Sequence, residues 1–248
     1  MKTLRNIMIL VFLQMTVNSC YIDHWFDCVD GRGGVISEDF NLNAFTELRL
    51  ALDADVYLLQ GDEHRIQIEA QPNIIDEIDF RIRNGVLTIG RDRCIRDHKK
   101  IEIYLTLIKL ESLSNSGSGD IYSDSNLDVG YIDLNISGSG NVELNVEGTQ
   151  INSHLSGSGD LRLWGSVDRI YHSVSGSGDL NAFGLDVNEA HLNVSGSGDS
   201  EVNVYEYLDV NISGSGNVYF IGNPEIHSRI SGSGQLIEAS SINREMDP

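Results

Sequence analysis

Residues 151–163 read Ile-Asn-Ser-His-Leu-Ser-Gly-Ser-Gly-Asp-Leu-Arg-Leu, and this stretch decides the fold. Its Ser-Gly-Ser-Gly core occurs seven times, and consecutive copies begin 18 to 21 residues apart. Self-similarity at a nearly constant period is the signature of a repeat architecture, in which each unit packs on its neighbours. The seven copies begin at Ser116, Ser137, Ser156, Ser175, Ser195, Ser213 and Ser231.

Apolar and polar residues alternate on both sides of the motif. In the quoted stretch, Ile151 and Leu155 alternate with Asn152 and His154. A period of two is typical of a strand that is buried on one face. We therefore predict that each repeat contains two short strands joined by the glycine-rich turn. A second turn is expected between copies, near Gly148, Gly165, Gly184 and Gly222.

One such repeat cannot bury its apolar face alone, whereas stacked repeats share backbone hydrogen bonds and one core. The predicted fold is all-β: a right-handed parallel β-helix, or β-solenoid, with a rise of about 4.8 Å per coil. The motifs hold 14 of the 25 glycines of the chain. A corner repeated in register requires either positive φ or a close backbone approach, and glycine permits both.

Residues 36–115 lack the motif but remain β-rich. Asn84-Gly85 separates two runs with apolar alternation, and this dipeptide is the strongest short-range signal for a hairpin. A solenoid needs a cap over its open end, and this N-terminal segment is placed to supply one. The β-helical repeats are expected over residues 116–242, and residues 243–248 are expected to form a tail.

The first residues are typical of an export signal. Lys2 and Arg5 precede an apolar run over residues 7–17, which is too short for a spanning helix of about 20 residues. Cys20 follows this run and resembles the lipidated cysteine of bacterial lipoproteins. We predict a signal peptide over residues 1–19, lipid on Cys20, a tether over residues 20–35 and anchoring at the outer membrane. Ordinary secretion with cleavage nearby is the alternative.

If Cys20 carries lipid, Cys28 and Cys94 are the remaining cysteines. Two remaining cysteines in an exported chain are consistent with a single disulfide between them. Two unpaired thiols are the alternative, because the sequence gives no Cα separation.

The charge of the chain excludes one class of partner. The 248 residues carry 17 basic and 37 acidic side chains, for a formal charge of −20. Nucleic acid is therefore not an expected partner, since its binding depends on phosphate neutralisation. Residues 116–240 hold 17 acidic residues and three arginines, which disfavours a lyase that must hold an acidic glycan.

The turn carboxylates are the most specific candidates for a functional site. Asp160, Asp179 and Asp199 occupy the same position in three successive turns, so stacked coils would bring their charges within about 4.8 Å of each other. Either calcium ligation or Asx-type hydrogen bonds to turn amides would offset the repulsion. The spacing differs from that of calcium-binding nonapeptide repeats, so we expect the hydrogen bonds, and no cofactor. His172 falls at an inward position and is expected to be a satisfied core histidine.

Several segments together resemble the putative auto-transporter adhesin "head" family, called the head GIN domain. The resemblance runs from about residue 35 to residue 242. It rests on the recurrent Ser-Gly-Ser-Gly-Asp and on residues 45–48, 54–56, 60–62 and 84–89. The family implies a β-helical fold and a periplasmic or surface location, and it brings no catalytic residues.

The sequence thus predicts a non-enzymatic cell-envelope lipoprotein with an adhesin-like domain that binds glycan or protein ligands through unidentified residues. A structural envelope scaffold without a ligand is one alternative. A carbohydrate-active β-helix enzyme is another, since a glycosidase needs two carboxylates at a defined separation and the chain has many acidic residues.

Overall fold

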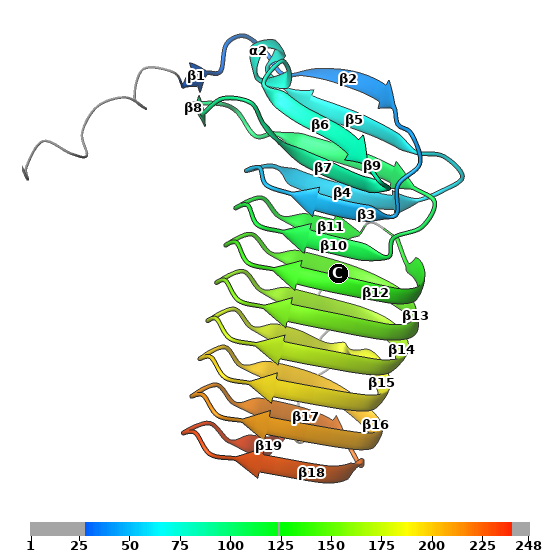
Figure 1. Cartoon of the computed structure of the whole chain (residues 1–248), viewed down its shortest axis with the longest axis vertical. Helices are drawn as coiled ribbons and strands as arrows, with labels where there is room; N and C mark the ends of the chain where they lie inside the picture. The colour runs from blue at the N-terminus through cyan, green and yellow to red at the C-terminus, as the bar shows by residue number, and fades with distance from the viewer. Residues whose placement is uncertain (1–27, 124, 240–248) are drawn as a thin grey trace, which may run out of the picture.

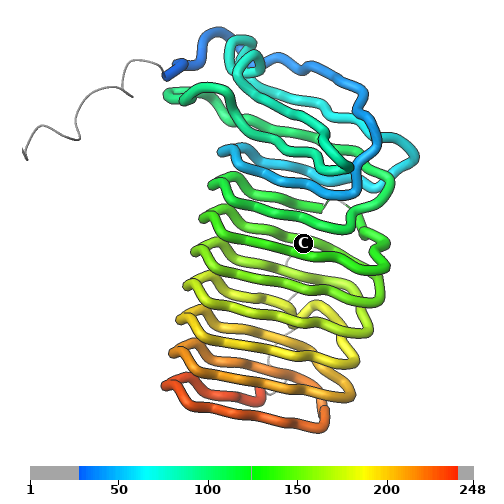
Figure 2. Tube along the Cα trace, in the orientation of Figure 1, coloured from blue at the N-terminus to red at the C-terminus, as the bar shows by residue number. Residues whose placement is uncertain are grey.

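The computed structural model describes residues 28–123 and 125–239, which form an elongated β-solenoid (Figures 1 and 2). Seventeen strands make one continuous sheet, and β1 (Val29–Asp30) and β8 (Ile95–Arg96) make a separate parallel pair. One short helix, α2 (Pro72–Ile75), lies in the described part of the chain. The predicted all-β solenoid class is confirmed.

Long parallel strands form the repeating coils. Ile136, Leu155, Val174, Val194 and Ile212 are partners in the register of successive strands, and all five are buried. The inward columns of the alternating pattern therefore close one core along the axis. The strands of these coils are β12 (Leu127–Ile136), β13 (Val142–Leu155), β14 (Leu161–Val174), β15 (Leu180–Val194), β16 (Ser200–Ile212), β17 (Val218–Gly222), β18 (Glu225–Ile230) and β19 (Leu236–Glu238).

The prediction of two short strands in each repeat is wrong for the middle coils. β13 continues from Val142 through Gly148 to Leu155 and stays paired with β14 along this length. The ladder survives because neighbouring strands bend at the same place, so their hydrogen bonds are preserved. The strand is interrupted between β17 and β18, at Asn223 and Pro224, and proline has no backbone N–H to donate.

The Ser-Gly-Ser-Gly segments form the corners that separate one long strand from the next. The backbone N–H of Ser158 donates to the carbonyl oxygen of Gly138 at 3.1 Å, and that of Ser177 to Gly157 at 3.0 Å. A Cβ placed on Gly157 would lie 2.0 Å from the carbonyl oxygen of Gly138. The corner glycines do not have positive φ. Glycine is needed at these positions because the stacked backbones approach each other too closely for a side chain.

Parallel stacking also extends into the N-terminal part. β3 (Glu47–Leu50) pairs in parallel with β7 (Val86–Arg91) on one side and β10 (Ser112–Asn115) on the other. β4 (Asp55–Gln60) lies in the same way between β9 (Glu102–Leu107) and β11 (Ile121–Ser123). The coil made by β3 and β4 is therefore inserted between two coils that come later in the chain.

Antiparallel strands cover the N-terminal end of the solenoid (Figure 1). β5 (Arg65–Ala70) pairs with both β2 (Ile36–Asn41) and β9, and β6 (Ile78–Arg83) pairs with β7. Asn84 and Gly85 connect β6 to β7 with φ of 53° and 80°, the conformation that a tight hairpin turn requires. The predicted hairpin is thus present.

Candidate binding surface

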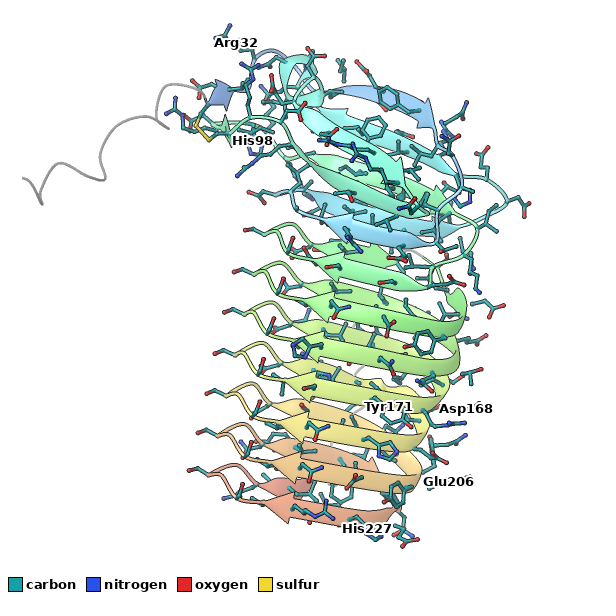
Figure 3. All side chains as sticks on the ribbon, in the orientation of Figure 1. Arg32, His98, Asp168, Tyr171, Glu206 and His227 are labelled. Atoms are coloured by element: carbon teal, nitrogen blue, oxygen red, sulfur yellow. A yellow bond between two sulfur atoms is a disulfide. The ribbon has the colours of Figure 1, made fainter. Side chains whose placement is uncertain are left out.

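Two of the sequence-predicted site residues meet at the N-terminal end. Cys28 and Cys94 are joined by a disulfide with a Cα–Cα distance of 4.4 Å, visible as the yellow bond in Figure 3. Next to it, the Arg96 guanidinium donates to Asp30 and lowers the pKa of that carboxyl. Cys20, the predicted lipidation site, lies outside the described residues, as do the predicted signal peptide and the tail.

The corner carboxylates form a ladder of hydrogen bonds between coils. The backbone N–H of Asp179 donates to Asp160 Oδ1 at 2.9 Å, and that of Asp199 to Asp179 Oδ1 at 2.7 Å. The ladder extends through Asn141 above and Asn217 below. Each side chain thus accepts from the equivalent amide of the next coil. A charge-assisted hydrogen bond of this kind offsets the repulsion between stacked carboxylates.

The ladder affects one neighbouring carboxyl group. Burial, followed by the charges of Asp179 and Asp199, raises the pKa of Glu201. Within residues 28–123 and 125–239, no three His, Cys, Asp or Glu side chains are grouped so that they could hold a metal ion. The arrangement gives the corner carboxylates a structural role as amide acceptors.

His172 lies in the core of β14, at the predicted inward position. Its Nδ1 is 2.8 Å from the Oγ of Ser153, which occupies the same column of the preceding coil. Burial lowers the pKa of His172 to about 3, so the ring is neutral at physiological pH. The expectation of a satisfied histidine holds for one nitrogen only, because Nε2 has no hydrogen-bond partner among the described residues.

Four outward-facing rings follow one another along β14, β15, β16 and β18, and we call them the aromatic strip. The rings of Tyr171 and His191 are stacked, with centroids 4.7 Å apart and planes at 6°. His191 lies 5.6 Å from Tyr207, which in turn lies 5.4 Å from His227. Figure 3 labels the two ends of the strip, Tyr171 and His227.

A polar network continues from the strip toward the N-terminal end. Asp133 Oδ1 accepts hydrogen bonds from Tyr131 Oη at 2.7 Å and from Asn152 Nδ2 at 3.1 Å. The hydrogen bond to Asp133 raises the pKa of Tyr131. Gln150 Nε2 donates to Asn152 Oδ1 at 2.9 Å, which fixes the orientation of this amide.

A shallow depression of about 190 Å³ lies where the strip meets the network. Tyr171 stands between Asn152 and His191 in the register, so the ring face opposite His191 is turned toward the depression. Among the lining residues Asp133 is the one carboxylate, whereas glycoside hydrolysis needs two. The surface has the groups that hold a ligand by hydrogen bonds and ring stacking. The outward residues that line the depression are Asp133, Asn135, Asn152, His154, Tyr171, Ser173 and Asn193.

The family comparison agrees with the fold and with these sequence motifs. Residues 44–224 match the family described as "Putative auto-transporter adhesin, head GIN domain". The chain belongs to this family. No curated protein matches the chain.

Several solved structures share the fold of this head GIN domain protein. A putative adhesin from Bacteroides fragilis superposes with a TM-score of 0.82 at 24% identity, covering 85% of this chain and 100% of that one. A putative lipid binding protein from Parabacteroides distasonis gives a TM-score of 0.73 at 26% identity, covering 86% and 99%. A putative adhesin from the same species gives 0.71 at 25% identity, covering 86% and 100%.

Sequence reasoning missed the aromatic strip and the depression. The alternating pattern predicts polar outward positions, but it does not show that the rings of Tyr171, His191 and Tyr207 form one surface. Aligning the repeats by their Ser-Gly-Ser-Gly motifs brings Tyr171 and His191 into one column. Tyr207 belongs to the neighbouring outward column and reaches His191 only through its side-chain direction.

The corner ladder predicts how substitutions of Asp179 affect stability. Asp179→Ala removes the acceptor for the Asp199 amide and should lower the free energy of unfolding by about 2 kcal/mol. Asp179→Asn should stay near the wild type, because Asn141 and Asn217 already fill this position. Urea denaturation measures both changes. A chelator should leave the melting midpoint unchanged, and a clear decrease would instead show that the carboxylates bind calcium.

Proposed function

We propose that this head GIN domain protein is an exported, lipid-anchored adhesin of the cell envelope that binds glycan or protein ligands without catalysis. The observation that carries the proposal is the outward surface made by the aromatic strip and the depression beside it. Aromatic rings next to fixed amides and a carboxylate are the usual composition of recognition surfaces. Membership of an adhesin-like family supports the same role.

The proposed location rests on the N-terminal sequence and the disulfide. Lys2, Arg5 and the apolar run over residues 7–17 would direct export, and Cys20 would carry the lipid. The Cys28–Cys94 disulfide suits an oxidising compartment. In the described residues no helix is both long and apolar enough to cross a membrane. Two or more acyl chains on Cys20 would hold the protein at the outer membrane, on its periplasmic or surface face.

The anchor predicts where the protein fractionates. The wild-type chain should remain with the membrane fraction and incorporate a labelled fatty acid, whereas Cys20→Ser should abolish the label and release the protein. Cys94→Ser serves as the control, because it removes a cysteine that is not the proposed lipid acceptor. A labelled Cys20→Ser protein, or an unlabelled wild type, would contradict lipidation at this residue.

The binding surface predicts the effect of removing one ring. The purified protein should retain ligands on an array of glycans and envelope or matrix proteins, and Tyr171→Ala should weaken that binding at least about tenfold. Tyr104→Ala is a matched control, since Tyr104 is also exposed and stacked, but on a different surface. If no glycan or protein is retained at high protein concentration, the chain is a scaffold. If polysaccharides release reducing ends on incubation, it is an enzyme.

A further inference from the structure

The register between β15 and β16 shifts at two places, and the larger shift lies in the first half of β15 (yellow in Figure 2). Ala182 pairs with Val202 of β16, and the next pair joins Asp186 to Asn203. Phe183, Gly184 and Leu185 therefore have no counterpart on β16. β15 also carries one extra residue against β14 between the pairs Arg162–Asn181 and Trp164–Gly184. Bulges that redirect side chains are over-represented next to active sites, and exposed aromatic side chains lie on both neighbouring strands of this one.

An indole ring lies on one side of the bulge. Trp164 of β14 is 42% exposed, which is unusual for the largest aromatic side chain. A Cβ placed on Gly184 would lie 2.3 Å from Cδ1 of Trp164. The indole thus packs directly on the backbone of the bulge, in space that any other residue at position 184 would fill. The absence of a side chain at Gly184 makes room for the ring, much of which stays open to solvent.

A second exposed ring is held on the other side of the bulge. Tyr205 of β16 is 48% exposed, and its hydroxyl donates to Asp186 Oδ1 at 2.8 Å. The same oxygen accepts from Asn203 Nδ2 at 2.7 Å, and Asn203 is only 3% exposed. A buried amide therefore orients the carboxylate that orients the tyrosine.

The two rings contact positions only two residues apart in the chain, Gly184 and Asp186. We propose that this bulge platform, made of Trp164, Gly184, Asp186 and Tyr205, binds a sugar unit of an uncharged glycan. The inference rests on the proposed adhesin function and names a ligand class and a site for it. It adds a surface separate from the depression beside Tyr171.

The chemistry of the platform favours an uncharged sugar. The apolar C–H face of a sugar ring packs on an exposed aromatic ring, and the sugar hydroxyls donate to acceptor oxygens. Asp186 supplies acceptor oxygens, and the Tyr205 hydroxyl oxygen can accept as well, since its own proton is donated to Asp186. An anionic glycan is disfavoured, because residues 116–240 carry 17 acidic and three basic side chains.

The fluorescence of Trp164 tests the platform directly. The chain has two tryptophans, so Trp25→Phe leaves Trp164 as the only indole reporter. The probes are a panel of uncharged hexose oligosaccharides, a uronic acid oligosaccharide, a glucosamine oligosaccharide and an oligolysine peptide. We expect at least one uncharged oligosaccharide to shift the emission to shorter wavelength with a saturable dependence on concentration, and the anionic and cationic probes to cause no such shift.

Two substitutions distinguish the loss of the Trp164 ring from a change in its position. Trp164→Ala should reduce binding of that oligosaccharide at least about tenfold, measured by calorimetry, and Trp164→Tyr should restore part of it. Gly184→Val keeps the indole but displaces it, so it should also lose binding. Gly130→Val is its control, because a Cβ at Gly130 meets no atom within 4 Å. Melting midpoints of all variants show that the fold is retained.

The outcomes distinguish this inference from the proposed function. Glycan or protein binding that is unchanged by Trp164→Ala would overturn the platform and leave the adhesin proposal standing. Binding of only the cationic or anionic probes would overturn it as well. Retention of no ligand at all would overturn both proposals. A saturable shift of Trp164 emission that Gly184→Val abolishes and Gly130→Val preserves would support the platform.

Discussion

The whole structure depends on how closely the backbones of successive corners approach each other. At Gly157, Gly176 and their equivalents, the space that a Cβ would need is occupied by a carbonyl oxygen of the neighbouring coil, 1.9 to 2.4 Å away. Any side chain there would push the coils apart. The glycine column therefore sets a common rise and register at one edge of the solenoid, and the strands continue that register across both faces.

Because successive coils stack in register, equivalent residues of each repeat lie above one another and form continuous surfaces. Inward positions become continuous apolar columns, and outward positions become ladders in which like residues meet. Stacked carboxylates would repel each other, but Asp160, Asp179 and Asp199 each accept the amide of the following coil. The same stacking places Tyr171 against His191 with nearly parallel rings. Binding surfaces on this molecule are thus built from positions about 19 residues apart in the chain.

The coil, its corners and the inward columns were predictable from the sequence, because a motif in seven copies and a period of two report directly on stacking and burial. For the middle coils the second turn was wrongly predicted, since glycine at position 148 is also compatible with a strand that bends while paired, whereas the strand does end at Gly222. The insertion of the coil of β3 and β4 was not predictable, because it depends on pairings between distant segments. The β15 bulge appears in the sequence only as one 20-residue spacing, and the packing of Trp164 on Gly184 needs coordinates.

The central claim is that corner glycines are required because stacked backbones leave no room for a side chain. The most direct measurement is the free energy of urea unfolding for Gly157→Ala beside Gly130→Ala, two Gly-to-Ala changes outside the positive-φ region. The claim predicts a loss of about 3 kcal/mol or more at position 157, from overpacking against Gly138, and a change of less than about 0.5 kcal/mol at position 130. Equal effects of the two substitutions would contradict it.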